Sequence, residues 1–526
     1  PCQTTVPEGR YELVVERGKT FLPHKQSVDV GQSDVAVIVR LKRWCQPQAR
    51  GWYSGDTHLH RTIDDLKVII LSEDLNVALP LTNWVTNSDQ PPRAGDKNLD
   101  DIPEGLIVVD PNHVIWPRNT EYEIFRVGQT RHTLGALFVL GHQRGLDVGV
   151  PPWRPVIESV RQSDPQSLYD MDKLDWPFAM LLPTIADGAL YELSNNHVWR
   201  TEFAFRDWNT KAPAYMRPPF GASEGGHREW IDYTLGMYYT LLNCGLRMPP
   251  SAGTANGVHP VPAGFGRVYV HQPEGFEYSG WLDGLRDGRS FVTTGPMVYA
   301  TADGDDPGTE MVFRSDSLKP VRIEAVVESE KKLSYGEVLV NGRPEVLLRP
   351  SNRPTEAGTY RSEIQVDLEV KRSGWIAVRF WEPRDDGQTR FVHTAPWYVV
   401  VDDEAVRPLG REKRYLVQRM QEEIARSSGV VSDQAMLEYQ RALSFYESLE
   451  VYDDTDEVAG ESRPTTGEDQ ERWLDNMIIH HQFDIDEIRR ATGLSPDDAD
   501  EAIRKRAAQQ APGALRGVPS PGGRHP

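Results

Sequence analysis

The sequence predicts an α/β protein built from several domains. Residues 51–310 alternate strand-like and helix-like segments, which is the pattern of a layered α/β unit. Residues 311–402 change to short strands separated by turn residues, and residues 403–511 become helical and charged. At 526 residues, the chain is also too long for one hydrophobic core. We therefore expect a small N-terminal β domain (1–50), an α/β unit (51–310), a β-sandwich (311–402), a helical region (403–511) and a disordered tail (512–526).

Residues 1–50 are expected to form a small β unit that packs as a lid or edge on the α/β unit. β-branched runs at 11–16 and 35–41 predict two strands, and Gly18, Pro23 and Gly31 separate them. The unit holds two of the three cysteines. A Cys2–Cys45 bridge and free thiols are equally compatible with the sequence.

The α/β unit is predicted from short apolar runs and two helical patterns. Strand-like runs occupy 105–110, 134–140 and 189–193. Helical periodicity over 231–242 predicts a helix that ends near Gly245, and a shorter helix over 281–286 closes at Gly288.

The last third of the chain changes from strands to helices. Strands expected at 321–327, 337–341, 375–381 and 397–401 predict a sandwich of the immunoglobulin type. Apolar residues then recur at helical spacing over 417–424 and 436–449. Residues 483–496 resemble a helix-turn-helix phrase, but many acidic residues make this segment a poor surface for phosphates. Packing or a dimer contact is the better interpretation, so a homo-oligomer is one expectation.

Charge and hydropathy exclude two classes of partner. The formal net charge is −20, whereas broad nucleic-acid binding needs a basic surface. No apolar run reaches the roughly 18 residues that a membrane-spanning helix needs. We therefore expect no nucleic-acid partner and no membrane span. The chain begins at Pro1, which a cleaved export signal or a trimmed chain would explain, so a secreted (periplasmic or extracellular) protein and a cytoplasmic one are the alternatives.

The segment Gly51-Trp-Tyr-Ser-Gly-Asp-Thr-His-Leu-His60 carries the strongest chemical signal. His58 and His60 are two residues apart at a probable strand end, so both imidazoles point to the same face. Asp56 lies on that face too. Neutral imidazole is a common ligand of zinc, manganese and iron, and the segment therefore predicts part of a metal site.

Further metal ligands are expected at the ends of other strands, because such sites gather at one edge of a parallel sheet. Glu121 follows a strand-like run, and His132 precedes the run at 134–140. Glu192 and His197 flank an Asn-Asn turn, and His259 follows a glycine-rich segment. The predicted ligands are therefore His58, His60, Glu121, His132, His197 and His259.

Several phrases together resemble the CehA/McbA-type metallohydrolases of the polymerase and histidinol phosphatase (PHP) superfamily. The resemblance covers about residues 51–297 and rests on the segments 51–60, 119–123 with His132, 191–197, 266–270 and 284–296. It implies a distorted (β/α)7 barrel with divalent metals at the strand ends. It also implies hydrolysis of phosphoesters or of carboxylic and carbamic esters.

The chain departs from the superfamily pattern at three places. Thr82-Asn-Trp84 stands where a Thr-Asp-His motif is usual, and Lys173-Leu-Asp-Trp176 lacks an expected histidine. Ala255 stands where an aspartate is expected. We therefore expect a reduced site with one or two divalent ions, either zinc, manganese or iron.

The resulting hypothesis is a metal-dependent hydrolase that acts on a small-molecule or polymer ester. A bound metal would lower the pKa of its water toward neutrality. The candidates for acid–base work are Asp56, Glu73 and His197. Arg200, Arg267 and Arg289 are candidates for holding an anionic substrate group. The alternative is a non-catalytic PHP-like protein that binds a carbohydrate or a protein partner.

Overall fold

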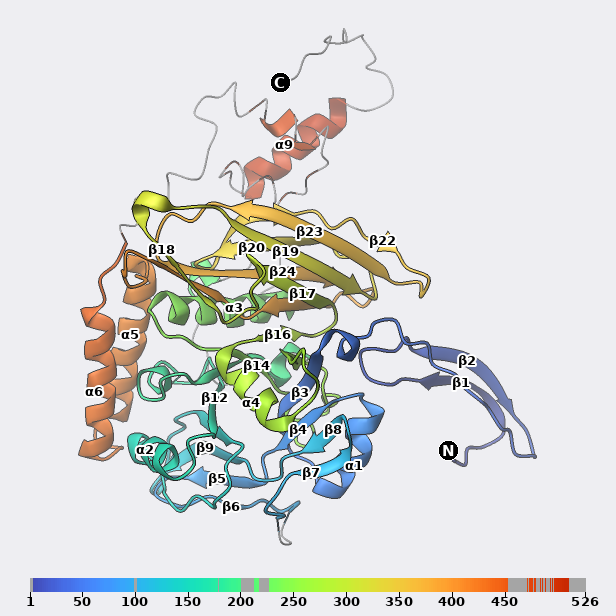
Figure 1. Ribbon diagram of the computed structural model, residues 1–526, viewed down its shortest axis with the longest axis horizontal. Helices are drawn as coiled ribbons and strands as arrows, with labels where there is room; N and C mark the ends of the chain where they lie inside the picture. Colours follow the sequence, from blue (N-terminus) through green and yellow to red (C-terminus); the bar gives the residue numbers. More distant parts are fainter. Residues whose placement is uncertain are drawn as a thin grey trace.

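The computed structural model describes residues 3–98, 102–177, 179–199, 212–216 and 227–452, together with parts of 471–509. Cys2, Arg200 and the expected tail 512–526 lie outside the described residues. The predicted α/β class is confirmed, because the structure combines helices with sheets of two, four, eight and twelve strands (Figure 1). The described strands do not close into a barrel.

The helices are α1 (Ile63–Ser72), α2 (Arg154–Ser163), α3 (His227–Asn243), α4 (Tyr278–Asp287), α5 (Gly410–Ser427), α6 (Asp433–Ser448) and α9 (Pro496–Gln509). The eight-stranded sheet contains β5 (Asn83–Asn87), β6 (Arg93–Ala94), β9 (Thr120–Val127), β10 (Thr130–Arg131), β11 (Ala136–Leu140), β12 (Leu168–Asp172), β13 (Leu190–Ser194) and β14 (Pro250–Ala252).

The twelve-stranded sheet contains β3 (Trp52–Leu59), β4 (Val77–Pro80), β7 (Ile107–Asp110), β8 (His113–Ile115), β15 (Arg267–His271), β16 (Ser290–Thr293), β18 (Glu310–Phe313), β20 (Tyr335–Val340), β21 (Arg343–Leu348), β24 (Gly374–Pro383), β25 (Thr389–Thr394) and β26 (Trp397–Val401). The four-stranded sheet contains β17 (Met297–Ala302), β19 (Val321–Ser329), β22 (Arg353–Pro354) and β23 (Tyr360–Leu368), and the two-stranded ribbon contains β1 (Gly9–Val15) and β2 (His24–Val30).

Strand β3 runs through the middle of the twelve-stranded sheet. All of its residues are buried, and it pairs with β15 antiparallel and with β4 parallel. Helix α4 packs so closely on β3 that a Cβ at Gly55 would lie 2.2 Å from a ring atom of Trp281. The Trp281 indole donates a hydrogen bond to the Tyr53 carbonyl over 2.9 Å. This packing fixes the strand that carries the two adjacent histidines.

The two large sheets meet where the chain leaves β14. The Ala255 N–H donates to the His58 carbonyl over 2.7 Å, and the His60 N–H donates to the Asn256 carbonyl over 2.8 Å. These bonds hold the segment after β14 against the end of β3. Side chains from β9, β12 and β13 of one sheet can therefore meet those from β3 of the other.

The sandwich expected over 311–402 shares a sheet with the α/β unit. Strand β16 pairs antiparallel with β25, so one sheet continues across the boundary expected at residue 310. Strands β19, β20, β24 and β26 occupy the four segments expected to be strands. The four-stranded sheet packs on this sheet around a core that includes Phe291, Met297, Val378 and Trp397.

The N-terminal unit forms a strand pair that projects from the body (Figure 1), but its second strand differs from the prediction. Strand β2 covers His24–Val30, whereas residues 35–41 form no strand. Val35, Val37 and Ile38 are exposed there. β-branched residues favour a strand only where a partner strand is in register, and within the described residues this segment has none.

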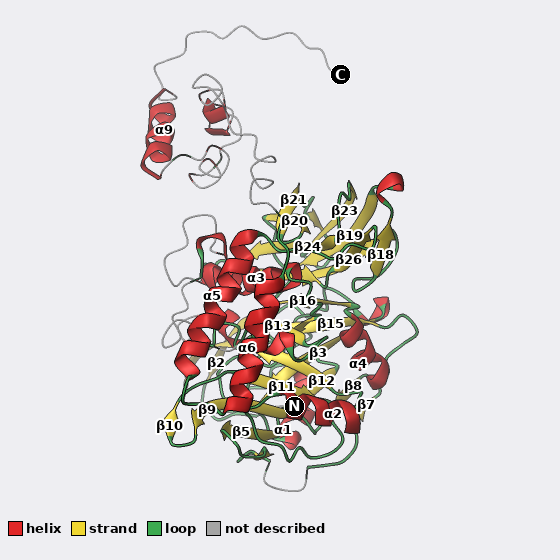
Figure 2. Ribbon diagram, turned by 90° about the vertical axis from the view of Figure 1, so that its left-hand side faces the viewer, coloured by secondary structure: helices red, strands yellow, loops and turns green. Residues whose placement is uncertain are grey.

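The helical region packs on the flank of the α/β unit, as α5 and α6 lying side by side (Figure 2). The Glu438 carboxylate of α6 accepts the Trp153 and Arg154 N–H groups, each over 2.8 Å. It thereby satisfies free donors at the N-terminus of α2. Helix α9 has a separate small core with Leu474, Met477 and Ile488. Among the described residues, no helix combines the length and apolar character that a membrane crossing requires.

Candidate metal centre

His58 on β3 and His60, directly after the end of this strand, face the same point, as their spacing predicts. Their Nε2 atoms lie 3.2 Å apart, and His60 Nε2 lies 3.3 Å from the Glu121 carboxylate on β9. His58, His60 and Glu121 are all buried. Two imidazoles and one carboxylate, each within 4.8 Å of the others, are a donor set that could hold a metal ion.

The second nitrogen of His58 is held by carboxylates from the neighbouring strands. His58 Nδ1 lies 3.2 Å and 3.3 Å from the two Glu192 oxygens and 3.9 Å from Asp172. When Nδ1 carries the proton and donates it to Glu192, the Nε2 lone pair points at His60 and Glu121. A carboxylate that orients a ligating imidazole in this way is a common second layer of metal sites. His58, Asp172 and Glu192 also form a donor group of their own.

Several polar atoms of the cluster are buried without a hydrogen-bond partner. They are Glu121 Oε2, Asp172 Oδ1, His197 Nδ1 and the Trp84 indole nitrogen, whose ring centroid lies 5.4 Å from that of His60. An unsatisfied buried polar atom costs about 1–3 kcal/mol, so native proteins keep few of them. Lone pairs on His58, His60 and Glu121 that face one another would all be satisfied by one cation. The residues present therefore fit a metal ion.

Electrostatics favour the same conclusion. Burial lowers the pKa of His60 to about 4 and the pKa of His58 well below its usual value, so both rings are neutral and able to ligate at pH 7. Burial raises the pKa of Glu121 and of Glu123 to about 8. It also raises the pKa of Glu192 well above its usual value, and Asp172 adds to this shift. A divalent cation would displace protons from such carboxyl groups.

Lys173 places a permanent positive charge in the same cluster. It is 6% exposed, and its Nζ forms an ion pair with Asp172. Burial alone would lower its pKa, but Asp172, Glu123 and Glu121 raise the value above that of free lysine. The backbone at Lys173 has φ = 57°, a left-handed conformation that is uncommon for residues other than glycine. Because Asp172 is engaged by this ammonium, the donor set fits one ion better than two.

His197 and His259 lie at the rim of the cluster. Their ring centroids are 6.4 Å apart. Both residues lower the pKa of His58. The Asn195 side chain accepts the His197 N–H over 3.1 Å and fixes the short turn that carries this ring. Burial lowers the pKa of His197 to about 3, so the ring is neutral. Of the six predicted ligands, His58, His60 and Glu121 form one possible metal-binding group, and His197 and His259 act on it electrostatically.

His132 is the predicted ligand that the structure does not bring to the cluster. Its Nε2 lies 3.0 Å from the Ser427 hydroxyl, and its Nδ1 accepts a hydrogen bond from Arg426 over 3.1 Å. These partners belong to the end of α5. His132 therefore joins the helical region to the α/β unit instead of binding a metal.

Asp56, a predicted catalytic residue, is an anchor. Its two oxygens accept hydrogen bonds from the Thr254 hydroxyl (2.6 Å), the Gly264 N–H (2.8 Å), the His58 N–H (3.1 Å) and the Thr254 N–H (3.3 Å). Burial raises its pKa to about 6 despite these bonds. With both oxygens occupied, Asp56 ties the loop after β14 to β3 and has no lone pair directed at substrate.

The remaining predicted residues lie elsewhere. Glu73 ends α1, where its carbonyl accepts a hydrogen bond from Arg267, and its side chain lines a different cavity. Arg267 is fully buried and donates to the carbonyls of Gly264, Glu73 and Asp74, so it braces the backbone. Arg289 pairs with Asp287 at the surface. Arg200 lies outside the described residues.

Residues 170–173 are the part of the centre that sequence reasoning missed. Asp170 and Asp172 are two residues apart at the end of β12, as His58 and His60 are at the end of β3. Asp172 belongs to a possible metal-binding group, whereas Asp170 accepts hydrogen bonds from Thr57 and Ser251. This spacing could have been recognised in the sequence. The contribution of Lys173 could not have been recognised there, because a lysine after a strand is usually solvated.

Comparisons with protein-family models, with curated proteins and with solved structures found no match.

Proposed function

We propose that the protein is a hydrolase that uses one divalent metal ion to cleave a phosphoester or a carboxylic or carbamic ester. The observation that carries this proposal is the buried set of His58, His60 and Glu121, whose possible ligand atoms all lie within 4.8 Å of one another. A PHP-like origin of the α/β unit, with strands that do not close into a barrel, is part of the same proposal.

Zinc, manganese and iron all accept two imidazoles and a carboxylate. When bound, the ion would lower the pKa of a water molecule to about 7 and polarise the scissile bond. Glu192 orients His58 for this ligation through its contact with Nδ1.

Other residues of the centre supply substrate contacts and proton transfer. The Lys173 ammonium lies among the carboxylates of the centre, where it can stabilise negative charge that develops on a substrate oxygen. His197 has a buried Nδ1 without a partner and can exchange a proton with the leaving group. The unpaired indole N–H of Trp84 can donate to a substrate oxygen beside His60.

Metal analysis with activity assays tests the proposal. The purified full-length chain should contain about one divalent ion per molecule and hydrolyse at least one of p-nitrophenyl phosphate, p-nitrophenyl acetate and an aryl carbamate. His58→Ala and Glu121→Ala should lose both the ion and the turnover. His24→Ala, a change on the projecting strand β2, is the matched control and should keep both. A folded wild-type protein with neither bound metal nor metal-stimulated turnover would refute the proposal.

A second function, binding without catalysis, is favoured by one observation. Lys173 already neutralises Asp172, and a centre whose charge is balanced in this way can persist without a catalytic ion. In that case the α/β unit would bind a carbohydrate or a protein partner. A metal-free wild type that binds such a partner as tightly as the metal-loaded protein would favour this function.

A further inference from the structure

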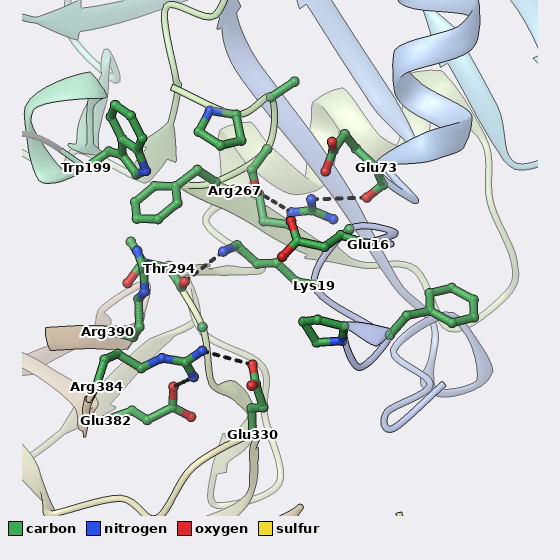
Figure 3. A pocket seen from close by; sticks show the side chains of 18 of the residues that line it. Glu16, Lys19, Glu73, Trp199, Arg267, Thr294, Glu330, Glu382, Arg384 and Arg390 are labelled. Carbon is green, nitrogen blue, oxygen red and sulfur yellow. Dashed lines mark hydrogen bonds and ion pairs between the residues drawn. The ribbon is translucent and has the colours of Figure 1, made fainter. Parts of the chain in front are cut away.

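A cavity of about 250 Å³ lies where the N-terminal unit, the α/β unit and the sandwich meet (Figure 3). Lys19 lines it from the N-terminal unit, Glu73 and Arg267 from the α/β unit, and Arg384 and Arg390 from the sandwich. Its volume is just below the roughly 300–1,000 Å³ of most ligand pockets, so a ligand would be small.

The four cations in this wall differ in their partners. Arg384 pairs with acidic side chains and lies 2.7 Å from Glu382 and 3.1 Å from Glu330. Arg267 is braced by backbone carbonyls, and its guanidinium donates to the Glu73 carbonyl over 3.1 Å. Burial raises the pKa of Glu73, while Arg267 and Lys19 lower it.

The other two cations, Lys19 and Arg390, have no carboxylate at ion-pair distance among the described residues. The Lys19 ammonium donates to the Thr294 carbonyl over 2.7 Å, which is an uncharged acceptor. Arg390 stacks on the Phe265 ring at 4.2 Å, and its Nη1 is buried without a hydrogen-bond partner. Glu16 is the remaining acid of the wall, and it is exposed.

The two cations also act on each other. Burial lowers the pKa of Lys19 well below its usual value, and Arg390 lowers it further. Burial and the neighbouring Arg384 lower the pKa of Arg390 to about 10. Carboxylates farther away, Glu73 for Lys19 and Asp386 and Glu382 for Arg390, offset these shifts only in part. Two close cations that lack an ion-pair partner are unfavourable in the free protein, and a bound anion would relieve this cost.

Another part of the wall is aromatic. Phe21, Trp44, Trp199 and Phe265 line the cavity, and Phe265 also lies under the Lys19 ammonium at 4.7 Å. We propose that this cavity binds a small carboxylate with a ring or another apolar body, held between Lys19 and Arg390 and packed against the aromatic side chains. The planar guanidinium of Arg390 matches the geometry of a carboxylate. This site is independent of the metal centre.

Titration of the full-length protein with benzoate tests the proposal. Benzoate should bind saturably by calorimetry and raise the melting temperature, equally before and after treatment with EDTA, because binding to the native state stabilises it. Arg390→Gln and Lys19→Met should each weaken binding by about tenfold or more, the usual effect of losing a charge-assisted hydrogen bond. Arg314→Gln removes the same charge from an exposed ion pair with Asp403 and should bind benzoate like the wild type.

The stability of the variants separates a binding role from a structural one. Without benzoate, Arg390→Gln should melt at or above the wild-type temperature, because it removes an unbalanced cation. A marked fall in its melting temperature would show that Arg390 holds the fold together and would overturn the proposal. Wild-type protein that binds no benzoate, or that binds inorganic phosphate equally well, would overturn it too. If Arg390→Gln does not fold, the Lys19→Met titration decides.

Discussion

The contact between His58 and Glu192 makes a quantitative prediction about metal affinity. Glu192→Gln keeps the size of the side chain and one acceptor oxygen but removes the charge that holds the proton on His58 Nδ1. Both Glu192 oxygens lie within 3.3 Å of that nitrogen, so the substitution acts directly on the orientation and basicity of His58. Loss of such an orienting carboxylate weakens metal binding by about 10- to 100-fold, or about 1.4–2.7 kcal/mol.

Competition with a chelator of known zinc affinity measures this change. The charge-matched control is Glu158→Gln on the surface of α2, which should leave the affinity unchanged. The site is tightly packed, because a Cβ at Gly253 would lie only 2.6 Å from Glu192. Circular dichroism therefore checks that Glu192→Gln remains folded. Zinc affinity of Glu192→Gln within about threefold of the wild-type value would refute the orienting role.

Three further predictions concern stability. Glu438→Ala should lower the free energy of unfolding by about 1–3 kcal/mol in urea denaturation, because two N–H groups of α2 lose their acceptor. Gly55→Ala should destabilise by about 1–3 kcal/mol or more, because the new methyl group meets Trp281; an unchanged melting temperature would contradict the described packing. His393 has its pKa lowered to about 3 by burial, so between pH 6.5 and 3 the unfolded state binds more protons than the native state. The contribution of His393 to the free energy of unfolding is complete above pH 6.5. It should be lost by up to about 1.4 kcal/mol per pH unit as the pH falls. In urea denaturation, the free energy of unfolding of His393→Asn should therefore depend less steeply on pH than that of the wild type.

Local signals in the sequence predicted much of the fold. The alternating residues of β26 match its alternating burial, whereas β24 is buried on both faces. Gly288, with φ = 75°, ends α4 where expected. The strand expected at 35–41 does not form, because a strand needs a partner strand. The local sequence does not indicate whether such a partner is present. The boundary expected at residue 310 reflects a change in sequence pattern, whereas the pairing of β16 with β25 is a long-range contact.

The difference between local sequence signals and long-range contacts also applies to the metal centre. His58 and His60 belong to one strand, so the geometry of that strand was enough to place them together. His132 and Asp172 depend on how distant strands and helices pack. His132, a histidine before a strand, was predicted as a ligand and instead contacts Ser427, whereas Asp172 was not predicted and lies beside His58. Charge balance by Lys173 can be recognised only when its acidic neighbours are known.

The continuous twelve-stranded sheet limits how the protein can be divided. A chain cut at residue 310 would turn β16 into an edge strand with unpaired N–H and C=O groups, a known source of aggregation. Trp52 and Phe291 would also lose core neighbours such as Trp397. The sandwich and the strand that carries His58 and His60 should therefore unfold in one cooperative transition, and a substitution deep in the sandwich can weaken the metal centre without touching it.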